Sequence, residues 1–384
     1  MAKLLYLISE DWFFCSHFME RAKAAQAQGF EIVVLTRVSS HGQRIRDAGF
    51  LLVPLEMDRS SIGIAKEWVA LRQIRTVYRQ HRPDLVHQVA MKPIVYGSLV
   101  ARFSGPHAVL NAPVGMGYLF TSGTAKARLL RPLVRILLRW LLNPRGSKVV
   151  FENDEDLQDC VRSQMVRAAD AVLIPGAGID TALFHPRAVP STGPPVVVMA
   201  ARLLQDKGVA EFVAAARLLR ERGVPARCWL VGAADPGNPS SFSPAQLNAW
   251  KAQGDVELLG HRNDMATLLR ECDLACLPSY REGLPKFLLE AMATGLPVVS
   301  TDAVGCRQAV VEGVSGLLVP VRDAAALADA LQRLIGDASA RARMGAAGRE
   351  RALHEFSRER IERLTLAQYR ALAAGLPRQP WRRQ

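Results

Sequence analysis

Short, almost wholly apolar runs recur along this chain, and each is bounded by glycine, proline or polar residues. In the first half these runs cover 3–9, 31–35, 50–55, 84–87 and 108–111. Runs of this length without polar alternation are typical of strands buried on both faces. The spacing between them predicts helices over 16–28, 45–48 and 64–80. Strands that alternate with helices predict a parallel α/β sheet covered on both faces.

The same pattern restarts after a stretch that holds Pro186, Pro190 and Gly193, which we interpret as an interdomain linker. Strands are then predicted over 196–199, 228–231, 256–259, 274–277, 298–300 and 316–319. Helices are expected from 324 to 373, followed by a basic tail. A chain of 384 residues also favours two domains over one.

Composition limits the class of protein. With 49% hydrophobic and 22% charged residues, the chain is expected to be globular. It lacks an uncharged apolar run of about 18 residues, so we expect no transmembrane helix, and its first residues lack the features of a signal peptide. The six cysteines form no CxxC pair, and we interpret them as packed, reduced thiols. The net charge of +13 favours an anionic partner without choosing among nucleic acid, membrane and phosphorylated substrate.

The segment with the most candidate functional residues is PSYREGLPKFLLEAMA, residues 278–293. This stretch follows a predicted strand, turns through Gly283 and starts a helix near Pro285. The backbone amides at such a helix start favour negative charge. Glu282 at the turn and Glu290 eight residues later are carboxylates that accept hydrogen bonds from vicinal hydroxyls, as on a sugar. The structural alternative is that Glu282 caps the helix and Glu290 pairs with a base.

This E-x7-E frame resembles the signature of the retaining glycosyltransferases of family 4 (glycosyltransferase group 1), which have the GT-B fold. Further segments that resemble the family are 201–208, with an R-x4-K-G phosphate clamp, 229–232, 259–261, 301–306 and 313–320. The resemblance implies an α/β fold of two facing Rossmann-like domains with a cleft between them. We therefore expect an acceptor-side domain over 1–187, a nucleotide-sugar domain over 188–356, and a helix and basic tail over 357–384 that cross back to the first domain.

By resemblance, Arg202, Lys207 and Glu282 are the expected catalytic residues, and Arg202 and Lys207 would hold the donor diphosphate. A guanidinium and an ammonium neutralise the charge that builds on such a leaving group. The alternative for this pair is a solvated loop. Glu290 would hold the ribose hydroxyls. The full expected donor site is Arg202, Lys207, Gly260, His261, Glu282, Gly283, Leu284, Pro285 and Glu290.

On this interpretation, no metal or other cofactor is expected. The expected co-substrate is a nucleotide sugar. We expect it to be UDP-linked, with a GDP-linked sugar as the alternative. Asp154-Glu155-Asp156 spells the DxD pattern of metal-dependent sugar transferases of another fold. However, Asn153 and Asp154 precede a helical pattern, so helix capping is the simpler interpretation.

Segments in the N-terminal half indicate a subgroup of this family. Segments 83–93, 111–120, 151–154 and 174–180 resemble bacterial enzymes that extend polyprenyl-diphosphate-linked saccharides. Many family members carry a glycine pair after the first strand, which the loop 9–17 lacks, and Gln308 stands where a glutamate is frequent. Acceptor-side candidates are Asp11 and His17, with capping or packing as the alternative, and Lys92, with a solvent-facing lysine as the alternative.

The expected function is retaining transfer of a hexose or N-acetylhexosamine from a UDP-sugar onto a lipid-linked saccharide, in assembly of lipopolysaccharide O-antigen, capsule or another glycan. The segment 126–148 interleaves arginines with apolar residues and a tryptophan, which suits an anionic bilayer or packing on its own domain. We expect a cytoplasmic protein, peripheral on the inner face of the plasma membrane. The rivals are a UDP-sugar epimerase or hydrolase of the same fold and a non-catalytic protein that binds anionic lipid. Nucleic acid is not expected, because the basic residues lack interleaved stacking aromatics.

Overall fold

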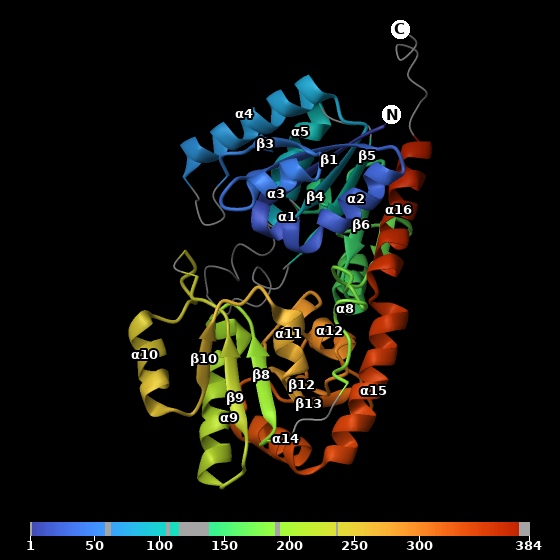
Figure 1. Cartoon of the computed structure of the whole chain (residues 1–384). Coiled ribbons are helices and arrows are strands. Elements are labelled where there is room, and N and C mark those ends of the chain that lie inside the picture. Colours follow the sequence, from blue (N-terminus) through green and yellow to red (C-terminus); the bar gives the residue numbers. More distant parts are fainter. Residues whose placement is uncertain are drawn as a thin grey trace. The chain divides into compact units, whose positions relative to one another are not determined.

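The chain folds as two compact α/β units in a computed structural model (Figure 1). The first unit contains 1–177 together with 361–384, and the second contains 178–360. The structure describes residues 2–57, 63–104, 108–114, 138–188, 193–235 and 237–375.

The first unit is built on a parallel sheet of seven strands in the order β3-β2-β1-β4-β5-β6-β7. The strands are β1 (Lys3–Glu10), β2 (Glu31–Arg37), β3 (Leu51–Pro54), β4 (Leu85–Val89), β5 (Ala108–Ala112), β6 (Ser147–Phe151) and β7 (Ala171–Leu173). The strand order reverses between β1 and β4, and ligands of open α/β sheets bind beyond the carboxyl ends of the strands at such a reversal.

Helices cover both faces of this sheet. They are α1 (Asp11–His17), α2 (Met19–Ala27), α3 (Gly42–Asp47), α4 (Ile64–His81), α5 (Met91–Ser104) and α8 (Asp154–Arg162). The side chains of β1 alternate between the two layers, because successive residues of a strand point to opposite faces. Leu4 and Tyr6 join a core with α1, α2 and α3, whereas Leu5 and Leu7 join a core with α4 and α5. Burial on both faces explains why the run at 3–9 lacks polar alternation.

The first unit includes the end of the chain. Helix α16 (Arg358–Ala374) buries Ile361, Thr365 and Tyr369, and Ile361 and Tyr369 pack in the same core as β1 and α2. The Tyr369 hydroxyl lies 2.8 Å from the Tyr6 hydroxyl and 2.7 Å from Nδ1 of His87. The burial of the ring holds the pKa of His87 far below its usual range, at about 3, so the imidazole is neutral at physiological pH. Residues from opposite ends of the sequence therefore share one buried polar contact.

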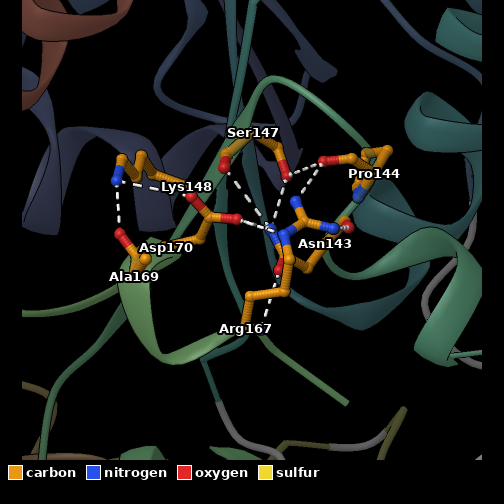
Figure 2. A network of polar contacts seen from close by, with 7 residues as sticks. All are labelled: Asn143, Pro144, Ser147, Lys148, Arg167, Ala169 and Asp170. Carbon is orange, nitrogen blue, oxygen red and sulfur yellow. Dashed lines mark hydrogen bonds and ion pairs between the residues drawn. The ribbon is translucent and has the colours of Figure 1, made fainter. Parts of the chain in front are cut away.

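A polar network braces the strands β6 and β7 where both begin (Figure 2). The buried Asn143 amide nitrogen donates to Oγ of Ser147 at 3.0 Å and to Oδ2 of Asp170 at 3.3 Å. Arg167 joins this pair: its backbone N–H donates to the side-chain oxygen of Asn143, and its guanidinium donates to Asp170. Lys148 lies 3.4 Å from the other Asp170 oxygen. In this network, side chains provide hydrogen-bond partners for polar groups that the backbone hydrogen bonds of the sheet leave unpaired.

The second unit repeats the architecture with a parallel sheet of six strands in the order β10-β9-β8-β11-β12-β13. The strands are β8 (Val196–Ala200), β9 (Arg227–Val231), β10 (Glu257–Gly260), β11 (Leu274–Leu277), β12 (Val298–Thr301) and β13 (Gly316–Val319). Its helices are α9 (Val209–Glu221), α10 (Pro244–Gln253), α11 (Met265–Arg270), α12 (Lys286–Ala293), α13 (Cys306–Ala309), α14 (Ala324–Gly336) and α15 (Ala338–Glu355). Here the order reverses between β8 and β11.

The predicted strands are confirmed, although β6 and β7 were not predicted. Two predicted helices are wrong in their extent. The helix predicted over 45–48 begins three residues earlier, at Gly42. The segment 16–28 belongs to two helices, because Phe18 adopts a φ of −124° and interrupts the helical backbone between α1 and α2. Helix α1 begins directly after β1, five residues before the predicted start at 16. All six cysteines are buried and free, as expected for packed thiols.

Candidate functional site

The expected donor residues gather at the carboxyl edge of the second unit's sheet, where the strand order reverses. Arg202 and Lys207 lie on the connection from β8 to α9, and Glu282 lies on the connection from β11 to α12. Strands β8 and β11 are hydrogen-bonded neighbours, with Leu274 opposite Val197. Two loops separated by about 75 residues in sequence therefore leave the sheet side by side, at the place where this class of sheet binds ligands.

The two loops are fastened to each other through backbone groups. The N–H of Tyr280 donates to the carbonyl of Asp206 at 2.9 Å, and the Ser279 hydroxyl donates to the same oxygen at 3.1 Å. Gly208 has a φ of +73°, and a Cβ added there would lie 2.0 Å from the carbonyl oxygen of Pro278. Only glycine permits both this backbone conformation and this approach. The geometry thus fixes Lys207 against the β11–α12 loop.

Lys207 and Glu282 form an ion pair in this arrangement. Nζ of Lys207 lies 2.6 Å and 2.8 Å from the two carboxylate oxygens of Glu282. The two side chains are only 17% and 12% exposed, so their attraction is screened less than that of a surface pair. A phosphate group that approached Lys207 would compete with this carboxylate.

Arg202 has its own carboxylate partner, Asp235. Nη1 of Arg202 lies 2.9 Å from Oδ2 of Asp235, which follows β9. The Arg202 side chain is 41% exposed, so its guanidinium remains open to a ligand at the strand ends. Sequence reasoning missed Asp235. Its position just beyond the carboxyl end of a strand is the signal that could have found it.

Tyr280 is a second residue that sequence reasoning left without a role. Its hydroxyl donates to Glu211 of α9, and the guanidinium of Arg322 lies 4.5 Å from the centre of its ring. Burial and the neighbouring Glu211 raise the pKa of Tyr280 to about 12, so the hydroxyl stays protonated and keeps donating. This contact adds a side-chain brace to the backbone contacts between the two loops.

Helix α12 places Glu290 behind this turn. Pro285 is the N-cap and Lys286 the first helical residue. Glu290 is 12% exposed, and its carboxylate lies 3.5 Å from Nζ of Lys286. Burial raises the pKa of Glu290 above its usual range, and the attraction of Lys286 offsets this only in part.

Gly260 and His261 follow at the end of β10. The carbonyl of Gly260 accepts the N–H of Gly232 at 2.8 Å, which ties the ends of β9 and β10 together. His261 is exposed, and its Nε2 lies 3.2 Å from Oδ1 of Asn263. The expected donor residues thus all lie in one unit, on β8, β10 and β11 connections and on α12.

The acceptor-side candidates lie in the first unit. Asp11 is fully buried and accepts hydrogen bonds from the backbone of Trp12, Ser39 and His41, each at 2.8 Å. Burial alone would raise the pKa of Asp11, but these hydrogen bonds outweigh it and lower the pKa, so the group is ionised. It braces the loop after β2. His17, at the end of α1, stacks on Phe13 with ring centroids 4.2 Å apart.

Lys92 lies in the first turn of α5, directly after β4. Its Nζ is 2.8 Å from Glu67 of α4, and the two side chains are 20% and 18% exposed. The lysine is therefore neither a solvent-facing group nor an isolated charge. Asp11 and Lys92 follow the two strands between which the order of this sheet reverses.

The acidic triplet at 154–156 forms the first turn of α8. The side-chain oxygen of Asn153 accepts the N–H of Asp156 at 2.8 Å, which confirms the capping interpretation. Within the described part of the chain, no group of three or more metal-binding side chains gathers at one place.

Comparison with known proteins gives consistent matches over both halves. The family described as "Glycosyl transferases group 1" matches 194–337, and "Glycosyl transferase 4-like" matches 3–153. The N,N'-diacetylbacillosaminyl-diphospho-undecaprenol alpha-1,3-N-acetylgalactosaminyltransferase of Campylobacter jejuni is 29% identical over 84% of this chain and 86% of its own. The UDP-Gal:alpha-D-GlcNAc-diphosphoundecaprenol alpha-1,3-galactosyltransferase of Escherichia coli is 25% identical over 72% and 73%.

Solved structures match the fold over nearly the whole chain. Sucrose-phosphate synthase from Thermosynechococcus elongatus superposes with a TM-score of 0.78 at 20% identity, covering 98% of this chain and 100% of that one. Anabaena HepE in complex with UDP and glucose also gives 0.78, at 19% identity and with the same coverage. Together with the two parallel-sheet units, these matches confirm the expected GT-B fold.

Proposed function

Since this chain belongs to the glycosyl transferases of group 1, and its N-terminal domain matches the glycosyl transferase 4-like family, we propose that it moves a hexose or N-acetylhexosamine from a UDP-sugar onto a saccharide carried by a polyprenyl diphosphate. The observation that carries this proposal is the pair of cations, Arg202 and Lys207, at the strand-order reversal of the second unit. Two relatives named for diphosphoundecaprenol-linked acceptors support the acceptor class. Surface polysaccharide or glycan assembly is the setting that such acceptors serve.

In the proposed donor complex, Arg202 and Lys207 hold the diphosphate. Glu290 accepts the ribose hydroxyls, and Glu282 with the turn at Gly283, Leu284 and Pro285 contacts the transferred sugar. The turn at Gly260 and His261 cradles the base.

The ion pair of Lys207 with Glu282 supports this assignment, because a diphosphate that replaces the carboxylate at Lys207 frees Glu282 for sugar hydroxyls. UDP in the HepE structures is consistent with a UDP-linked donor.

The proposed reaction retains the configuration at the anomeric carbon. The bond from that carbon to the diphosphate oxygen breaks, a bond to the acceptor oxygen forms on the same face, and a donor phosphate oxygen takes the acceptor proton. Arg202 and Lys207 stabilise the negative charge that develops on the departing nucleoside diphosphate. These two side chains supply the positive charge, so no metal ion is needed in this scheme.

The raised pKa of Glu290 gives a pH dependence that can be measured. The ionised carboxylate offers two acceptor oxygens to the hydroxyls, and protonation turns one of them into a donor. Because burial raises its pKa, the group takes up a proton at a higher pH than an ordinary glutamate. We therefore expect the KM for the donor to rise as the pH falls from neutral to mildly acidic. Glu290→Gln should bind the donor more weakly at neutral pH and show a flat profile. An unchanged profile in this variant would assign the dependence to another group.

The acceptor side of the proposal is the carboxyl edge of the first unit's sheet, with Asp11 and Lys92 beside it and His17 at the end of α1. A lipid-linked acceptor requires the enzyme at a membrane, and we infer a peripheral location on the inner face of the plasma membrane. Among the described helices, none is both long and apolar enough to cross a bilayer. Of the segment 126–148, residues 126–137 lie outside the described residues, and its Trp140 is 60% exposed.

The test is a donor screen with purified protein, a lipid extract and radiolabelled UDP- and GDP-sugars. Label that moves into the organic phase with one donor supports transfer to lipid and names the sugar. Label released only as free or isomerised sugar supports the epimerase or hydrolase instead. Turnover of no donor, with binding to anionic lipid retained, supports a non-catalytic binding protein.

A further inference from the structure

Helix α4 presents a basic face with an exposed tryptophan. Its inner side packs into the core through Ala70, Ile74, Val77 and Tyr78. Its outer side runs along the outside of the first unit (Figure 1). The exposed residues of this outer side, which we call the α4 face, are Lys66, Trp68, Val69, Arg72, Arg75, Thr76, Arg79 and Gln80. Trp68 is 60% exposed and Val69 is 42% exposed.

The α4 face is rich in positive charge. The sole acidic residue of the helix, Glu67, turns inward to Lys92. Lys66, Arg72, Arg75 and Arg79 are exposed, and within the described part of the chain none of them forms an ion pair. Some other exposed arginines have a carboxylate within 3 Å, as in the pairs of Arg162 with Asp159, Arg262 with Asp264 and Arg307 with Asp302. Unpaired charge of one sign on one helix face favours an extended anionic partner.

The α4 face begins at the edge of the sheet that we propose as the acceptor side. The ion pair of Glu67 with Lys92 places the first turns of α4 beside the first turn of α5. Helix α5 begins directly after β4, so Trp68 lies at the carboxyl end of the sheet, and the arginines follow along the helix. This is the edge at which Asp11 and Lys92 lie.

We propose that the α4 face docks on an anionic phospholipid bilayer, with Trp68 in the interface and the arginines on the headgroups. The proposal rests on the proposed function for its acceptor, since docking would bring the carboxyl edge of the first unit to a lipid-linked saccharide. Tryptophan is the aromatic residue that membrane interfaces favour, and lysine and arginine are attracted to anionic headgroups. A double-stranded nucleic acid would use the same charges, but its bases are stacked inside the duplex and offer the tryptophan no apolar layer.

The test is binding of the full chain to vesicles of phosphatidylcholine alone or mixed with phosphatidylglycerol, measured by co-sedimentation. The triple variant Arg72→Glu, Arg75→Glu, Arg79→Glu should lower binding to the mixed vesicles more than tenfold. The control variant Lys251→Glu, Arg333→Glu, Arg343→Glu changes the net charge equally at exposed residues of the second unit. It should bind as the wild type does. Equal losses in both triples would show that net charge alone drives binding and would overturn the proposal.

Trp68→Ser separates the bilayer from other polyanions. It should weaken binding to mixed vesicles several-fold while leaving retention on heparin unchanged, because heparin offers no apolar layer. Unchanged vesicle binding by both Trp68→Ser and the α4 triple would overturn the proposal. Circular dichroism and thermal unfolding check that every variant is folded. Vesicle binding needs no turnover, so a failed donor screen with intact, α4-dependent binding would refute the proposed transfer and leave the docking surface standing.

Discussion

Replacing Lys207 with alanine is expected to lower kcat/KM for the nucleotide sugar by about 10²–10³-fold, the loss typical of a group that stabilises developing negative charge. The lysine is held at the reversal of the second sheet by the contacts between the 202–208 and 278–285 loops. Without it, the departing diphosphate loses one of its two proposed cations. Glu282 also loses its counter-charge and would repel the phosphates.

Initial rates with saturating acceptor measure this effect. Lys207→Arg keeps the charge and should restore part of the activity, and Lys251→Ala, at an exposed residue of α10, should match the wild type. Calorimetric UDP affinity should fall together with kcat/KM in Lys207→Ala. Full activity in that variant, with the protein folded, would mean that the diphosphate is held elsewhere.

Substituting Gly208 with alanine is expected to disable the site through the backbone. A positive φ costs a non-glycine residue about 1–2 kcal/mol, and the added Cβ would overlap the Pro278 carbonyl, at 2.0 Å. Overpacking of this kind costs a further 1–3 kcal/mol or so. The loop of Lys207 must then move away from the loop of Glu282, so we expect transfer to be nearly abolished.

Gly254 offers a matched control, because its φ is +72° and an added Cβ would meet nothing within 4 Å. Gly254→Ala should therefore show only the cost of the backbone conformation and keep full activity. Urea denaturation of both variants measures the difference in unfolding free energy, and transfer rates measure the effect on the site. Equal unfolding midpoints would contradict the close approach at Pro278.

The sequence predicts the strands well for a physical reason. Strands buried on both faces must be continuously apolar, as at 196–199, and glycine or proline marks their ends. Helix α5 was missed because Pro93 and Gly97 lie inside it. Proline is tolerated in the first turn of a helix. Gly97 is required by packing, because a Cβ there would lie 2.7 Å from the side chains of Gln88 and Leu7. Such packing depends on neighbours that local sequence does not show.

In the candidate site, too, local sequence predicts some features and not others. Arg202, Lys207, Glu282 and Glu290 stand in local motifs, so their residue types and spacing were sufficient to select them. Their partners were not predictable. The contact of Arg202 with Asp235 arises because the ends of β8 and β9 are adjacent, and strand order is a property of the whole sheet. Lys207 and Glu282 meet for the same reason, since β8 pairs with β11 and the intervening strands lie to one side.

The placement of Tyr369 between Tyr6 and His87 has a consequence for synthesis on the ribosome. The N-terminal unit emerges first, yet its core includes Ile361 and Tyr369 near the end of the chain. Chains grow vectorially at about 5–20 residues per second, so this core stays incomplete until the whole second unit has left the tunnel. The second unit is continuous in sequence and has no such dependence. A released chain that ends at residue 360 should therefore carry a protease-resistant second unit and a first unit that is still open to cleavage.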